Sequence, residues 1–109
     1  MRTFDVAVIG SGPAGASAAL KLAENGISVV LIEKETLPRY KTCGGGFVFR
    51  GRRKMPFDVS SVVEREFYKI NVNFDKAGIY LSPKRDEPII SMIMRDDFDN
   101  LIVEKAKKA

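Results

Sequence analysis

Residues 3–33 read TFDVAVIGSGPAGASAALKLAENGISVVLIE, and the fold class is predicted from this segment. Thr3 to Ile9 is an apolar run rich in β-branched residues that ends at a glycine, which predicts a buried parallel strand. The alanine-rich segment from Pro13 to Asn25 predicts a helix, with proline in its first turn and Asn25-Gly26 at its end. Ser28 to Glu33 predicts a second buried strand. Strand, helix and strand within about 30 residues form a right-handed βαβ unit.

The turn between the first strand and the helix carries the pattern G-x-G-x-x-G at Gly10-Ser11-Gly12-Pro13-Ala14-Gly15. Glycine-rich turns are common, but here the turn lies between a predicted strand and a predicted helix, and Glu33 ends the next strand 18 residues after Gly15. Gly10 permits the tight turn, Gly12 lets the backbone approach a pyrophosphate, and Gly15 lets the helix pack closely. The N–H groups at the helix start would hold the phosphates, and Glu33 would accept hydrogen bonds from the adenosine ribose. The pattern therefore predicts a dinucleotide site.

Pro13-Ala14 within this fingerprint resembles the flavoprotein form, GxGPAG. Together with the position of the motif near the N-terminus, it resembles the FAD-binding fold of flavin disulfide reductases and aromatic hydroxylases, so the expected cofactor is FAD. The geometry of the fingerprint alone does not separate FAD from NAD. An acid at Glu33 would repel the additional phosphate of NADP.

The bulk composition is that of an ordinary globular domain, with 45% hydrophobic and 29% charged residues among 109. No apolar run reaches the ~18 residues that a membrane span needs. The one cysteine, Cys43, cannot form an intramolecular disulfide, so a reducing, cytoplasmic compartment is expected. The absence of histidine argues against a hydrolytic triad and against a metal site.

Residues 34–56 predict a long loop with one helical turn, because proline and several glycines interrupt regular structure. The loop is also basic, which suits an anionic ligand such as a pyrophosphate or a phospholipid head group, although a solvated loop explains the charge equally well. A nucleic-acid partner is not expected, since no aromatic side chains alternate with the charges. The basic residues are Lys34, Arg39, Lys41, Arg50, Arg52, Arg53 and Lys54.

Residues 57–94 predict a small antiparallel β meander, with Val59 to Glu66 fitting either a helix or a strand. The apolar side chains of the meander fit a core, or alternatively the lining of a lipid tunnel. Residues 95–109 predict an amphipathic terminal helix, because acids lead and lysines close the segment. The fold class is therefore α/β, a Rossmann-like βαβ FAD-binding unit (1–33) followed by the loop, meander and helix. A doubly wound sheet needs a third parallel strand, so we expect 1–109 to be the N-terminal part of a truncated FAD-binding domain.

Two further segments sharpen the assignment. Pro38-Arg39-Tyr40-Lys41-Thr42-Cys43-Gly44-Gly45-Gly46 resembles the segment after the second strand in the geranylgeranyl reductase family of FAD-dependent oxidoreductases. The segment Arg95-Asp96-Asp97-Phe98-Asp99-Asn100-Leu101 is similar to the R-x-x-F-D-x-x-L pattern of the same family. The resemblance spans the whole chain. The fingerprint is shared by very many flavoproteins, whereas the Cys-Gly-Gly segment is more specific.

This resemblance implies a set of site residues. Cys43, Gly44 and Gly45 would lie beside the isoalloxazine ring, and Arg39 and Lys41 would lie near the phosphates or the approach to the ring. Arg95 would contact the cofactor from the terminal helix. The expected cofactor-binding residues are Gly10, Gly12, Pro13, Ala14, Gly15, Glu33, Lys34, Arg39, Cys43, Gly44, Gly45 and Arg95, and Cys43 is also the candidate catalytic residue.

The resemblance also implies a reaction, the reduction of isolated C=C bonds of isoprenoid or prenyl-lipid chains with electrons from NADPH, ferredoxin or another carrier. The thiol of Cys43 would donate a proton or tune the flavin, or else it is a small packing residue. A peripheral membrane contact fits a lipid substrate. The alternatives are an FAD-dependent monooxygenase or halogenase of the aromatic-hydroxylase type, and a non-catalytic nucleotide-binding module or gene fragment. The chain alone is not expected to catalyse a reaction, because the substrate domain of the family lies downstream.

Overall fold

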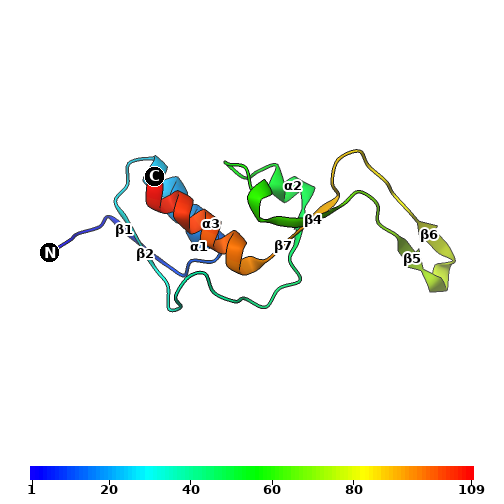
Figure 1. Ribbon diagram of the computed structural model, residues 1–109, viewed down its shortest axis with the longest axis horizontal. Helices are drawn as coiled ribbons and strands as arrows, with labels where there is room; N and C mark the ends of the chain where they lie inside the picture. The colour runs from blue at the N-terminus through cyan, green and yellow to red at the C-terminus, as the bar shows by residue number, and fades with distance from the viewer. The chain divides into compact units, whose positions relative to one another are not determined.

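The computed structural model describes residues 1–109, which divide into two compact units (Figure 1). Residues 1–43 and 95–109 form the first, here called the glycine-loop unit. Residues 44–94 form the second, here called the antiparallel unit. The chain therefore leaves the first unit after Cys43 and returns to it at Arg95.

The glycine-loop unit begins with the predicted βαβ motif. Strand β1 (Val6–Ile9) pairs in parallel with β2 (Val29–Ile32), so that Val6 lies opposite Val29 and Ile9 opposite Ile32. Helix α1 (Pro13–Glu24) connects the two strands and packs on both. The chain leaves α1 at Asn25, and Gly26 adopts a positive φ of 76°. The prediction for residues 1–33 is confirmed.

Helix α3 (Arg95–Lys108) lies alongside α1 in this unit (Figure 1). The alanines of α1 let the two helices approach closely, because their side chains add little bulk. The buried apolar core of the unit consists of Ala16, Ala19 and Leu20 from α1 and Phe98, Ile102 and Val103 from α3. The amphipathic terminal helix is therefore present, and its apolar face is buried within the first unit.

The antiparallel unit contains short elements. They are β3 (Gly46–Val48), α2 (Phe49–Arg52), the 3-10 turn Ser60–Val62, β4 (Val63–Phe67), β5 (Val72–Phe74), the 3-10 turn Asp75–Ala77, β6 (Ile79–Leu81) and β7 (Ile90–Ile93). The segment that fitted either a helix or a strand is thus one turn of 3-10 helix followed by a strand. The expected helical turn in the loop is α2, but the loop also contains the strand β3, which was not predicted.

The strands are antiparallel as predicted, but their order is not that of a meander. β7 lies between β3 and β4 and pairs with both, whereas β5 and β6 form a separate two-stranded hairpin. The meander prediction failed because it assumed that neighbours in sequence pair with each other. In the three-stranded sheet the central strand is instead the last one, and it pairs with residues far before it in the chain.

Arg52 fastens α2 to this three-stranded sheet. Its guanidinium forms an ion pair with Glu66 on β4 and donates to the hydroxyl of Ser91 on β7 at 2.9 Å. It also donates to Ser60 Oγ at 3.0 Å. Ser91 is fully buried, so this bond supplies a partner to a hydroxyl that water does not reach.

The apolar side chains expected to form a core in residues 57–94 are mostly not buried. Ile93 is buried, but Phe67, Phe74, Ile79 and Tyr80 are exposed, so the core prediction is wrong for most of this set. The hairpin of β5 and β6 has no second layer within its unit, which explains the exposure.

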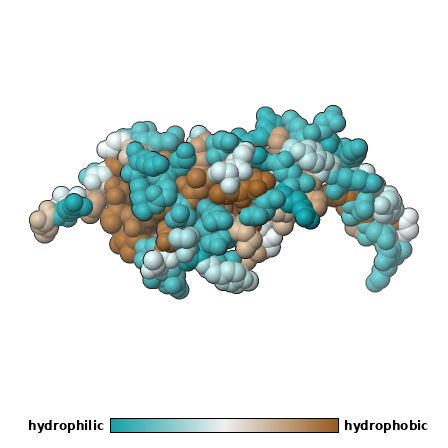
Figure 2. Space-filling model, in the orientation of Figure 1, coloured by the Kyte–Doolittle hydropathy of each residue, from teal (hydrophilic) through white to brown (hydrophobic).

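Apolar surface also remains on the glycine-loop unit, around β1 and β2 (Figure 2). Ile9 is 75% exposed and Ile32 is 47% exposed, although both lie on strands. A two-stranded sheet with helices packed against it leaves apolar side chains uncovered. No helix in the structure is both long enough and apolar enough to cross a membrane.

Candidate functional site

The glycine loop connects β1 to α1 and depends on two close approaches. The N–H of Gly10 donates to Ile32 O at 2.7 Å, which ties the loop to β2, and Gly10 has a positive φ of 94°. A Cβ on Gly15 would lie 1.9 Å from Gly10 O, which no side chain can occupy. A Cβ on Gly12 would meet nothing nearer than Arg95 Nη2 at 4.0 Å. Gly15 is therefore required by the fold, and Gly12 leaves a space in front of the helix.

The N-terminus of α1 faces this space without a protein group to neutralise it. Gly12 is the N-cap residue, no side chain caps the helix, and no acid lies in its first turn. Pro13 has no N–H, and the first ladder bond runs from Ala16 N to Gly12 O at 2.9 Å. The amides of Ala14 and Gly15 precede that ladder and keep their donor capacity. By contrast, α3 has two acids in its first turn, so of these two long helices only α1 presents a positive end that is free to bind an anion.

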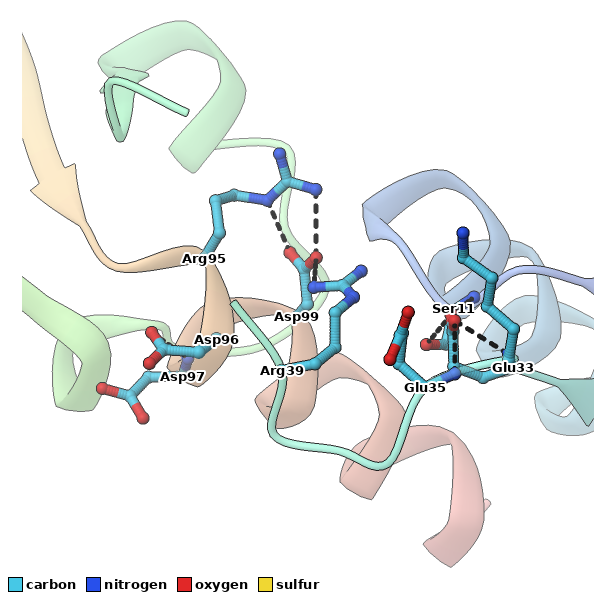
Figure 3. A network of polar contacts seen from close by, with 9 residues as sticks. Ser11, Glu33, Glu35, Arg39, Arg95, Asp96, Asp97 and Asp99 are labelled. Atoms are coloured by element: carbon cyan, nitrogen blue, oxygen red, sulfur yellow. Dashed lines mark hydrogen bonds and ion pairs between the residues drawn. The ribbon is translucent and has the colours of Figure 1, made fainter. Parts of the chain in front are cut away.

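Glu33 follows β2 and is bound to the glycine loop (Figure 3). Its Oε2 accepts from Ser11 N at 2.8 Å and from Ser11 Oγ at 2.6 Å. Its Oε1 accepts from the amides of Lys34 at 2.9 Å and Glu35 at 3.2 Å. These bonds, that from the Ser11 hydroxyl first, lower the pKa of Glu33 from 4.5 to about 2. Glu33 is therefore a carboxylate at neutral pH that holds the loop.

Asp99 on α3 holds two arginines of the predicted site (Figure 3). Its side chain is fully buried, and the Arg95 guanidinium donates to it from Nε at 2.8 Å and from Nη2 at 3.0 Å. Arg39 Nη1 lies 2.8 Å from Asp99 Oδ2 as an ion pair whose angle is not that of a hydrogen bond. One carboxylate thus faces two guanidinium groups, which leaves the cluster with a net positive charge.

Arg95 connects the glycine loop to the segment that carries the cysteine. Its Nη2 lies 4.0 Å from the Cβ position of Gly12, and its guanidinium also hydrogen-bonds with the Cys43 side chain. The hydrogen bonds that Arg95 donates to Asp99, and to a lesser extent the contact with Cys43, raise the pKa of Arg95, so it remains a cation at every relevant pH. Three residues singled out from separate parts of the sequence, Gly12, Cys43 and Arg95, therefore meet at one place.

A groove of about 850 Å³ lies in the same unit beside Glu33. Its polar lining residues are Ser11, Ser28, Glu33, Glu35 and Lys107, and most of the others are apolar residues, among them residues of β2, α1 and α3. Its volume is within the range of small-molecule sites.

The sequence and the fold of this chain are similar to those of known proteins. The profile of the pyridine nucleotide-disulphide oxidoreductase family matches residues 4–102. The chain belongs to this family. The match covers the glycine loop, Glu33, Cys43 and Arg95, and so includes the whole of the cluster described above.

Three curated relatives match nearly the whole chain. An uncharacterized protein of Methanosarcina barkeri is 35% identical over 97% of this chain, and the chloroplastic geranylgeranyl diphosphate reductase of Arabidopsis thaliana is 33% identical over 99% of it. A 1H-pyrrole-2-carbonyl-[peptidyl-carrier protein] brominase of Pseudoalteromonas luteoviolacea is 27% identical over 96%. The chain spans only 27%, 23% and 27% of these relatives, about a quarter of their length.

Among solved structures, a geranylgeranyl bacteriochlorophyll reductase-like protein from Thermoplasma acidophilum has a TM-score of 0.79 at 24% identity. The match covers 99% of this chain and 28% of that one, and it shows a shared fold. The prediction of an N-terminal FAD-binding portion with geranylgeranyl reductases among its relatives is confirmed by these matches and by the family membership.

Other predicted site residues of this oxidoreductase family member lie elsewhere. Lys34 is exposed, and only its backbone takes part in the Glu33 contacts. Gly44 and Gly45 belong to the antiparallel unit. Gly45 is buried with a φ of 74°, and a Cβ on it would lie 2.2 Å from Ile93 O. The close pairing of Gly45 with β7 is a structural reason for this glycine, independent of any contact with a flavin.

Two residues of the cluster were missed in the sequence. Asp99 was quoted only as part of a pattern, although its position four residues after Arg95 on a helix is the spacing of an ion pair. Ser11 occupies a variable position of the fingerprint, and no local signal showed that its buried hydroxyl would bind Glu33.

Proposed function

We propose that this chain is the FAD-binding portion of a flavin-dependent oxidoreductase that reduces C=C bonds of isoprenoid chains. The observation that carries the proposal is the position of the Arg95 guanidinium, which lies next to Gly12 of the phosphate-binding loop and bonds to Cys43. The fingerprint alone is shared by many flavoproteins. Here Arg95 additionally connects the fingerprint to the Cys-Gly-Gly segment, and this connection is the more specific feature.

The residues at the start of α1 fit the pyrophosphate of FAD. Gly12 leaves space for a phosphate, the amides of Ala14 and Gly15 can donate to it, and Arg95 places a fixed cation beside it. Asp99 keeps the Arg95 side chain in this position, and Arg39 pairs with the same carboxylate. The cluster is therefore a preformed anion site within a single unit of the chain.

Glu33 and the groove beside it fit the adenosine part. The carboxylate already accepts four hydrogen bonds, which fills its roughly four lone-pair sites. A ribose hydroxyl that binds Glu33 must therefore replace one of these donors. The longest of the four, from the Glu35 amide at 3.2 Å, is the one we expect to be replaced.

The reaction needs a hydride on one carbon of the double bond and a proton on the other. FAD, when bound, supplies the hydride chemistry. The Cys43 side chain is exposed and is positioned by its bond to Arg95, so it is our candidate for holding the proton. We propose NADPH or ferredoxin as the source of electrons, and a peripheral contact with the membrane where the substrate is a prenyl lipid.

Retention of flavin is the first test. The purified protein should keep a visible flavin absorption after gel filtration with added FAD. Arg95→Met should lower the affinity for FAD at least about tenfold, because a charge-assisted pair of bonds is lost. Lys108→Met, at an exposed position on the same helix, should leave the affinity unchanged. A colourless protein that cannot retain FAD would rule out the flavoenzyme and leave a nucleotide-binding module or a degenerate fragment.

The reaction is tested next, with the flavin loaded, in the protein expressed from its complete reading frame. Cys43→Ala should retain FAD but lose most of the reduction of a geranylgeranyl substrate, whereas Cys43→Ser should recover part of it if the residue donates a proton. Full activity of Cys43→Ala would show that the thiol is a bystander.

A second candidate is an FAD-dependent halogenase or monooxygenase, favoured by the match to the brominase. Such an enzyme must consume oxygen in its productive cycle, whereas the reduction of an isoprenoid consumes none. Oxygen uptake that depends on a halide or an aromatic substrate, with no reduction of geranylgeranyl chains, would favour this second function.

A further inference from the structure

A second cavity, of about 670 Å³, lies within the antiparallel unit and apart from the residues discussed so far. It runs from the start of α2 to the chain that leads into β7. Three backbone hydrogen bonds fix its walls, from Phe49 N to Ile89 O at 3.2 Å, from Ile70 N to Pro83 O at 3.2 Å and from Arg85 N to Tyr68 O at 2.9 Å. The cavity is therefore built from paired backbone segments.

Four cationic side chains line this cavity, Arg50, Arg53, Lys54 and Arg85, against a single acid, Glu87. All four are exposed, and none forms an ion pair. Like charges that converge on one cavity repel each other, and the single acid Glu87 offsets only part of that cost. They therefore form a concentrated positive site that an anion would stabilise.

Neighbouring arginines behave differently. Arg52, between Arg50 and Arg53 in sequence, points to Glu66 and Ser91 inside the unit, and Arg39 pairs with Asp99. The basic stretch of the sequence is therefore not uniform. Two of its arginines are used to hold the fold, whereas those at positions 50 and 53 are presented to the cavity.

The rest of the lining is apolar. The guanidinium of Arg53 lies over the ring of Phe49, 5.9 Å from its centroid. This contact holds the guanidinium where the cationic side chains meet the apolar wall of the cavity. That wall consists of Val48, Phe49, Ile70, Pro83 and Ile89. A small inorganic anion would leave this wall in contact with water, whereas an amphiphile would cover it.

We propose that this cavity binds a phosphate or diphosphate head group that carries an apolar chain. Arginine guanidinium groups bind phosphate oxygens through paired N–H donors, and the apolar wall takes the first carbons of the chain. The inference rests on the proposed function, since a reductase of isoprenoid chains needs a site for the charged end of its substrate. It deepens that proposal by assigning the head group to Arg50, Arg53, Lys54 and Arg85.

The test compares variants that remove two positive charges with variants that keep them. Arg53→Gln with Arg85→Gln removes two cations, Arg53→Lys with Arg85→Lys keeps the charge, and Arg65→Gln with Lys76→Gln is the control, at exposed positions outside the cavity. Each protein is titrated with geranylgeranyl diphosphate as single molecules, with geranylgeraniol, and with neutral vesicles that contain a small fraction of phosphatidic acid. Far-UV circular dichroism confirms folding before each titration.

The glutamine pair should weaken binding of geranylgeranyl diphosphate at least about tenfold, while the lysine pair and the control stay near wild type. Loss in the diphosphate titration alone identifies a free prenyl diphosphate, and loss in the vesicle titration alone identifies a phospholipid head group. Equal binding by the glutamine pair and the control in both titrations, or equal binding of geranylgeraniol and the diphosphate by wild type, would overturn the proposal. Flavin retention is measured on the same variants and should not change, so failure of this site is distinguishable from failure of the flavoenzyme assignment.

Discussion

Each unit of the chain contains a glycine pressed against a carbonyl oxygen, but the two partners lie at very different distances in the sequence. Gly15 faces Gly10 O within the same loop. Gly45 faces Ile93 O on β7, which lies at the other end of the unit in sequence. The first contact is contained in one short motif. The second contact forms only when β3 pairs with β7. The need for glycine at position 45 therefore cannot be recognised from the neighbouring sequence.

This contrast extends to the whole of each unit. The glycine-loop unit contains a core in which α1 and α3 bury six apolar side chains. In the antiparallel unit only Val59 and Ile93 are buried among the apolar residues, and the Arg52 network supplies much of the connection between elements. The glycine-loop unit therefore combines a local sequence motif with an apolar core. The antiparallel unit depends instead on strand pairing between distant residues and on polar contacts.

The largest effect is expected from alanine at either of these two glycines. Gly15→Ala and Gly45→Ala each place a methyl group within about 2 Å of a backbone oxygen, so the backbone must move, at a cost of about 4 kcal/mol of unfolding free energy. Gly45→Ala also forces alanine into a left-handed conformation. Denaturant unfolding followed by circular dichroism measures both.

Gly12→Ala is the matched control, because its Cβ would meet only Arg95 Nη2, at an ordinary contact distance of 4.0 Å. We expect it to unfold like wild type and yet to lose FAD binding, since the methyl group fills the space for a phosphate. If Gly12→Ala were as unstable as Gly15→Ala, the separation of fold and ligand roles within the loop would be wrong.

The next effect concerns the charged cluster of the first unit. Asp99→Asn should lower the unfolding free energy by about 3 kcal/mol, because two largely buried guanidinium groups lose their carboxylate. It should also weaken FAD binding, since Arg95 is no longer held beside Gly12. Asp97→Asn, exposed in the first turn of the same helix, should cost under about 1 kcal/mol. Equal stability of the two variants would show that Asp99 does not organise the site.

These residues show what the sequence could predict. Gly10, Gly12 and Gly15 act within one turn, and Glu33 ends the strand that pairs with β1, so local pattern and chain direction suffice to place them. Cys43 and Arg95 were placed by resemblance, and the structure brings their side chains together. The pairing of Arg39 with Asp99 could not be predicted, because the loop and α3 meet only through the tertiary fold.

The antiparallel unit shows what the sequence could not predict. Alternating apolar residues predicted antiparallel strands over 67–94, but alternation does not state which strand is a partner. β3 is only three residues long and lies among glycines, so it carries no strand signal of its own. The position of β3 in its sheet is set by its pairing with β7. The exposed apolar residues of the β5–β6 hairpin were predicted to form a core because the sequence does not show that this hairpin is separate from the three-stranded sheet.

A smaller effect is expected in the polar network of the antiparallel unit. Arg52→Met keeps the length of the side chain but removes the bonds to Glu66, Ser60 and the buried Ser91, and should cost about 2 kcal/mol. Arg65→Met, exposed on the same strand as Glu66, should cost about 0.5 kcal/mol or less. A larger cost for Arg65 than for Arg52 would contradict the view that polar contacts join this unit.

The smallest effect is the dependence of stability on pH that Glu33 contributes in the first unit. The pKa of Glu33 is about 2 in the folded protein and near 4.5 when the chain is unfolded, so the unfolded chain binds more protons between these values. The contribution of Glu33 is therefore complete above pH 4.5 and is lost as the pH falls toward 2. The bond from the Ser11 hydroxyl is the main cause, so Ser11→Ala should reproduce part of the loss.

The measurement is the urea midpoint of wild type and of Glu33→Gln across this pH range. The difference between the two proteins should be largest above pH 4.5 and should shrink as the pH approaches 2, because protonation removes from wild type what the substitution has already removed. Glu35→Gln, whose exposed carboxylate does not bind the loop, should follow wild type throughout. A difference between wild type and Glu33→Gln that stays constant with pH would mean that Glu33 acts by packing. In that case the fingerprint loop would be held by the Gly10–Ile32 bond and the Gly15 contact, and the acid after β2 would be reserved for the ligand.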